Sequence, residues 1–159
     1  MSDDYFEELE QWKNCIGKAI LGFGEIELIT LKCLEYFPTD NIYKTTSSLA
    51  LGRRIELLIE ILSESKKGIE VENILRMFRR AKKLVEFRNL LAHNPLMANI
   101  FEHKHTGDVE VKMLISNIRG KEKAVDLEDV KELSAEIEGL ASDLWISFSK
   151  AAGEDKINA

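Results

Sequence analysis

Apolar residues recur along most of this chain at the spacing of an amphipathic helix and, in one short part, at alternate positions. The helical spacing covers about 3–37, 45–65, 70–93 and 126–153. Around Val109 and Val111 the apolar residues alternate instead, which predicts a β-hairpin over about residues 99–118 with its turn at 106–108. The pattern therefore predicts a mainly α fold: a single domain over residues 1–159, a helical bundle of about four helices with a β-hairpin inserted before the last helix.

The distribution of apolar residues around the first predicted helix changes near its middle. Before Gly22 its apolar residues lie on one face, whereas after it they spread around the axis, which predicts that the second half is the most enclosed part of the bundle. Glycines at 17, 22 and 24 are costly inside a helix, so we expect a neighbouring backbone to approach closely there.

Two glutamates, Glu25 and Glu27, fall in this enclosed half. The expectation we favour is that one faces solvent and the other pairs with a Lys or Arg. The alternative is that a carboxylate orients Arg88 or His93 through a charge-assisted hydrogen bond.

The second helical stretch has candidate N-caps in the Thr and Ser residues at 45–48. Arg53 and Arg54 follow on its first turns, where the helix dipole disfavours cations, so each is expected to contact an acid or a phosphate.

The final stretch opens with an N-cap at Asp126 and ends in a tail, 153–159, that is expected to fray.

The nonapeptide 87–95 gathers a cation, an amide and an imidazole at the end of the third stretch: Arg88, Asn89 and His93. Asn94-Pro95 stops the helix, so His93 is expected in its last turn. On a regular helix Arg88 and His93 point about 140° apart, while Asn89 and His93 share a face. A joint site therefore needs an altered last turn, a swing of the long Arg88 side chain, or a second copy of the chain.

The segment 88–93, Arg-Asn-Leu-Leu-Ala-His, resembles the Arg-polar-x-x-x-His signature of the HEPN superfamily, the higher eukaryotes and prokaryotes nucleotide-binding domain. The resemblance implies a small helical domain acting as a homodimer, in which Arg88, Asn89 and His93 form a composite, metal-independent endoribonuclease centre. It also implies the alternative of a catalytically inactive HEPN-like module that binds a nucleotide, RNA or a protein. An antitoxin-like partner protein, as in toxin–antitoxin or defence systems, belongs to the same implication.

These residue types suit RNA cleavage. An imidazole titrates near neutral pH and can take a proton from a 2′-hydroxyl or give one to a leaving 5′-oxygen. A guanidinium can hold the scissile phosphate with two hydrogen bonds. The structural alternative is that His93 interacts with the helix dipole and Arg88 pairs with a glutamate.

Basic residues upstream of the nonapeptide offer an RNA-binding face, because Arg76, Arg80 and Lys83 share one side of a helix. The alternative is a solvated face that balances the acidic first and last helices. The net charge of −6 argues against broad coating of nucleic acid and leaves room only for such a local patch.

Other features limit the chemistry. Cys15 and Cys33 lie about 27 Å apart on one helix, so they cannot bridge each other, and reduced thiols are typical of the cytoplasm. His103 and His105 have the spacing of a metal pair on a strand face, but no further ligands with recognisable spacing accompany them, and we expect an exposed strand or turn. The sequence predicts no membrane segment, metal or cofactor.

Overall fold

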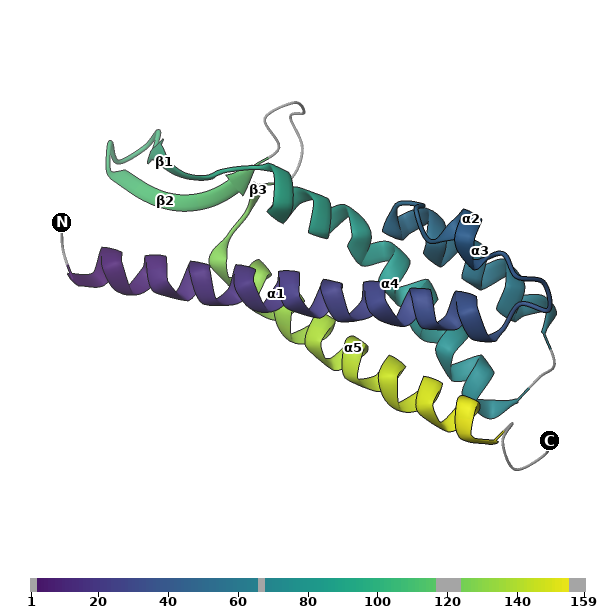
Figure 1. The fold of residues 1–159 in the computed structure, drawn as a ribbon. Coiled ribbons are helices and arrows are strands. Elements are labelled where there is room, and N and C mark those ends of the chain that lie inside the picture. Colours follow the sequence, from purple (N-terminus) through teal and green to yellow (C-terminus); the bar gives the residue numbers. More distant parts are fainter. Residues whose placement is uncertain (1–2, 66–67, 117–123, 155–159) are drawn as a thin grey trace.

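The computed structural model describes residues 3–65, 68–116 and 124–154 (Figure 1). In chain order the elements are α1 (Asp3–Tyr36), α2 (Tyr43–Thr46), α3 (Leu51–Glu64), α4 (Ile69–His93), β1 (Leu96–Glu102), β2 (Val109–Ser116), β3 (Ala124–Val125) and α5 (Leu127–Glu154). Four long helices form a bundle in which α1 packs along α5, and α4 packs against both α5 and α3. This confirms the predicted mainly helical fold, with a hairpin before the last helix.

The bundle is held together by one continuous apolar core. Its largest fully buried side chains come from every long helix and include Trp12, Ile26, Ile55, Phe78 and Leu144. Each such side chain contributes about 1.5–3 kcal/mol of burial free energy. An apolar face of every long helix therefore contributes to the core.

The hairpin pairs antiparallel, with Leu96 opposite Ile115 and Glu102 opposite Val109. It projects over the beginning of α1 (Figure 1). Its base is buried at Ile115, whereas Ile100 near the turn is 74% exposed. The part of the predicted hairpin beyond Ser116 lies outside the described residues. A short third strand, β3, pairs with the end of β2, and the sequence pattern did not predict it.

One local expectation, that a Thr or Ser residue at 45–48 caps the second predicted helix, is wrong. The residue that precedes α3 is Ala50, which makes no side-chain cap. Thr45 and Thr46 instead belong to α2, where each hydroxyl donates to the carbonyl of Ile42 at 2.8 Å. The helix α5 continues through Glu154, and the rest of the predicted tail, 155–159, lies outside the described residues.

The second half of α1 is less enclosed than predicted, because one of its sides faces solvent. Leu28 is 48% exposed, and Leu21, at the start of this half, is 71% exposed. Of the three glycines, only Gly22 meets a close neighbour: an added β-carbon would lie 2.7 Å from Cγ2 of Ile137 in α5.

Candidate functional site

The helix α4 stays regular as far as His93. The backbone N–H of Asn94 donates to the carbonyl of Leu90 at 3.2 Å, and the Asn94 side-chain amide donates to the same oxygen at 3.0 Å. Asn94 is extended (φ −122°), as the residue before a proline prefers to be. His93 therefore lies in the last turn, as predicted, and the turn does not unwind to bring it closer to Arg88.

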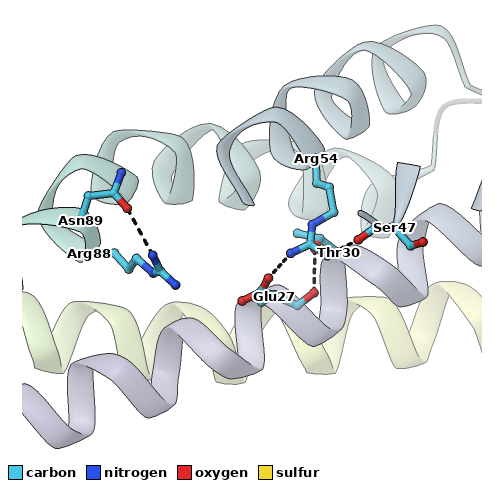
Figure 2. Close-up of polar contacts among 6 residues, drawn as sticks. All are labelled: Glu27, Thr30, Ser47, Arg54, Arg88 and Asn89. Carbon is cyan, nitrogen blue, oxygen red and sulfur yellow. Dashed lines mark hydrogen bonds and ion pairs between the residues drawn. The ribbon is translucent and has the colours of Figure 1, made fainter. Parts of the chain in front are cut away.

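Arg88 lies on the core-facing side of α4. It continues the buried stripe formed by Met77, Ala81 and Leu84 by one turn, yet it remains half-buried rather than enclosed. Its Nη1 donates to Oδ1 of Asn89 at 3.3 Å. Figure 2 shows the Arg88 side chain extending from α4 in the direction of α1.

No carboxylate pairs with Arg88 in the part of the chain that the structure describes. The alternative in which Arg88 is neutralised by a glutamate is therefore wrong for these residues. Its one hydrogen-bond acceptor among the described residues, the Asn89 amide, is neutral, so the charge of the guanidinium is available for an anion.

Asn89 and His93 are exposed and share the outer face of α4, as their spacing predicts. The structure brings Arg88 and Asn89 into contact but not Arg88 and His93, because the regular helix points these two in different directions. Within one copy of the chain, the three candidate residues do not converge on a single point.

Glu27 pairs with Arg54 rather than with a residue of the nonapeptide. Arg54 is 3% exposed; its Nη2 bonds Oε1 of Glu27 and its Nη1 donates to the carbonyl of Ser47 at 3.2 Å (Figure 2). Glu25 is exposed. The favoured expectation for the two glutamates is thus confirmed, and an acid is the partner of Arg54. The buried Nε of Arg54 has no partner among the described residues.

The basic face of α4 is partly neutralised. Arg80 bonds Glu136 of α5 at 3.0 Å, and Arg76 donates to the side-chain oxygen of Asn73 at 3.3 Å. Lys83 is exposed and has no ion-pair partner in the described ranges. The alternative to RNA binding was a solvated basic face that balances the acidic last helix. The contact between Arg80 and Glu136 agrees with this alternative.

The hairpin histidines lie in the connection between β1 and β2, not on a strand face. His103 and His105 are both exposed, and Nε2 of His103 lies 3.7 Å from a carboxylate oxygen of Glu110. Within residues 3–65, 68–116 and 124–154, no three His, Cys, Asp or Glu side chains gather as metal ligands.

An open cleft of about 260 Å³ lies under the hairpin and contains none of the candidate residues. Val111 and Met113 form its hairpin side, while Glu8 and Leu127 come from the first turns of α1 and α5. In the described part of the chain no helix is long and apolar enough to cross a membrane.

Sequence reasoning did not identify the pair formed by Arg54 and Glu27, although one signal for it was present. Arg54 interrupts the apolar stripe of α3 between Leu51 and Leu58, and a cation on such a stripe needs a buried partner. Which acid supplies that partner depends on how α1 packs against α3.

Comparison of the chain with family models, with curated proteins and with solved structures finds no match.

Proposed function

We propose that this chain is a metal-independent endoribonuclease of the HEPN type that acts as a homodimer in the cytoplasm. The observation that carries the proposal is Arg88, a half-buried cation on the core-facing side of α4 with no carboxylate partner in the described part of the chain. An uncompensated guanidinium at the edge of a core is costly to maintain, and a phosphate would compensate it.

In the proposed reaction, Arg88 holds the scissile phosphate through two parallel N–H groups and offsets the charge that develops on its oxygens. Asn89 orients the guanidinium by accepting from Nη1. The imidazole of His93 removes the proton of the 2′-hydroxyl, whose oxygen attacks phosphorus as the bond to the 5′-oxygen breaks. The 5′-oxygen takes a proton from a second histidine in its protonated, imidazolium form, leaving a 2′,3′-cyclic phosphate and a 5′-hydroxyl.

A second copy of the chain supplies what one copy lacks. The regular end of α4 separates Arg88 from His93, and one imidazole cannot act as base and acid in the same step. A homodimer provides two arginines and two histidines. Arg76, Arg80 and Lys83 then serve as contacts to the RNA backbone, with Lys83 the least neutralised of the three.

One observation favours the alternative of an inactive HEPN-like binding module. His93 has no hydrogen-bonding partner that fixes its ring among the described residues, whereas catalytic histidines are commonly oriented by one. In that function Arg88 still binds a phosphate, but no bond is broken.

The deciding experiment is incubation of a mixed RNA pool with the purified protein in EDTA. We expect cleavage that leaves cyclic phosphate ends and falls by at least about a hundredfold in His93→Ala and in Arg88→Ala. Matched controls are His105→Ala, an exposed histidine of the hairpin turn, and Arg53→Ala, whose cation pairs with Glu56 on the surface. Both controls should cleave as the parent does.

Binding of a fluorescent oligoribonucleotide separates the two functions. Binding that is lost in Arg88→Ala, without cleavage by the parent, would support the binding module. Cleavage that survives in His93→Ala, or that disappears in the parent when EDTA is added, would refute the metal-free mechanism.

A further inference from the structure

One side of α1 is apolar but faces solvent. It consists of Gly17, Leu21, Gly24 and Leu28, which we call the α1 stripe. Their spacing of four, three and four residues places them on one side of the helix. Leu21 is 71% exposed and Leu28 is 48% exposed. The contacts within this chain therefore leave the α1 stripe uncovered.

No contact among the described residues explains the two glycines of the stripe. A β-carbon added at Gly17 or Gly24 would meet no atom within 4 Å, whereas one added at Gly22 would collide with Ile137. A glycine inside a helix costs about 1 kcal/mol relative to alanine. Open space at such positions allows another backbone to approach closely, and nothing in the described chain uses it.

We propose that the α1 stripe is the surface on which a second copy of this chain docks, with the two α1 helices antiparallel. The order Gly, Leu, Gly, Leu with spacings of four, three and four residues reads in reverse as Leu, Gly, Leu, Gly with the same spacings. In an antiparallel pair Leu21 of one copy therefore lies opposite Gly24 of the other, and Gly17 opposite Leu28. Each leucine enters the space that a glycine leaves open.

The charges beside the stripe match the same arrangement. Lys18 and Glu25 are seven residues apart on one flank of the stripe, and both are exposed without an ion-pair partner among the described residues. They are about 10.5 Å apart along the axis, too far to pair within one helix. An antiparallel two-fold pair brings Lys18 of each copy beside Glu25 of the other, so the flank is self-complementary.

The opposite flank of the stripe carries Glu27, on the side of α1 toward which Arg88 extends (Figure 2). Two-fold pairing brings the same flank of both helices together, so the Arg88 side of each copy faces the same edge of the interface. That this geometry contributes to a composite site depends on the proposed function. The proposed interface between the two α1 helices does not depend on it.

The first test measures the mass of the parent and of single variants by sedimentation equilibrium without RNA. We expect a dimer in the parent and a rise of about tenfold or more in the dissociation constant for Leu21→Glu and for Gly24→Leu. Gly24→Leu fills the open space while raising helix propensity, so loss of the dimer there is not loss of fold. Ile69→Glu, at a 74% exposed position at the start of α4, is the matched control and should leave the dimer intact.

The second test exchanges the charges of the flank. Lys18→Glu alone places two acids together and should weaken the dimer, and adding Glu25→Lys should restore it, because the contact forms only between copies. A parent that stays monomeric at tens of micromolar overturns the proposal and leaves the stripe to another protein. A dimer that tolerates Leu21→Glu and Gly24→Leu overturns the location of the interface. Both results are independent of RNA cleavage.

Discussion

At the scale of single residues, the buried Arg54 and the half-buried Arg88 contrast most clearly. Arg54 is almost fully buried and pairs with Glu27, whereas Arg88 is half-buried and, among the described residues, bonds only the neutral amide of Asn89. A buried charge that is paired is a structural feature, while a partly buried charge without an acid is available to a ligand. This difference between the two arginines is present in a single copy of the chain. It is the reason that the proposed function is based on Arg88.

The close packing at Gly22 gives a prediction at this scale. Gly22→Ala should lower the free energy of unfolding by about 1–2 kcal/mol, because the added methyl group meets the buried Ile137 in α5. Gly139→Ala, at an open position inside α5, should raise it by up to about 1 kcal/mol. Urea unfolding at one fixed protein concentration checks both, and equal effects at the two positions would contradict the packing argument.

At the scale of elements, α3 and α4 are joined by a small surface network around Glu56. Its carboxylate binds Lys82 of α4 at 3.1 Å and Arg53 of its own helix at 2.8 Å. The hydrogen bond from Lys82, followed by that from Arg53, holds the pKa of Glu56 below its ordinary value. A carboxyl group whose pKa is lower in the folded protein than in the unfolded chain stabilises the fold at pH values above its unfolded pKa. This stabilisation is lost as the pH falls through the folded-state pKa.

This network predicts a pH dependence. The parent should be more stable than Glu56→Gln at neutral pH, and the difference should shrink as the pH falls below the ordinary glutamate pKa of about 4.3. Urea midpoints measured in steps from neutral to strongly acidic pH check this. Glu60→Gln, an exposed glutamate of the same helix, is the control. A gap between parent and Glu56→Gln that stays constant with pH would refute the assignment.

At the scale of the whole molecule, the bundle consists of α1 packed along α5 and α3 packed along α4, with α4 also resting on α5. The ion pair of Glu27 and Arg54 crosses from α1 to α3 and ties these two parts together beside the core. The inward side of α1 carries its buried core residues, such as Trp12 and Ile26, and the α1 stripe faces outward.

Loss of this ion pair should lower the stability of the whole fold. Glu27→Ala leaves the guanidinium of Arg54 buried without its acid, and we expect the free energy of unfolding to fall by about 2 kcal/mol. The loss is smaller than for a fully enclosed pair because the Glu27 side chain is 42% exposed. Glu60→Ala removes an exposed glutamate and should change stability by less than about 0.5 kcal/mol. Equal losses in the two variants would show that the pair is dispensable.

Features that are local in the chain could be predicted from the amino-acid sequence alone. Apolar spacing gave the long helices and the hairpin, Asp126 gave the reciprocal cap that begins α5, and Asn94-Pro95 gave the end of α4 at His93. These depend on residues a few positions apart, whose geometry a regular helix or strand fixes without reference to the rest of the molecule.

Contacts between residues from distant parts of the chain depend on how the helices pack, and they became known only with the fold. It paired Arg54 with Glu27, left Arg88 without an acid in the described part of the chain, placed β3 beside β2, and turned the α1 stripe outward. The apolar residues around α1 were compatible with burial on every side. Which side is covered depends on how many helices surround α1 and where they lie, and that is a property of the assembled bundle rather than of any short stretch of sequence.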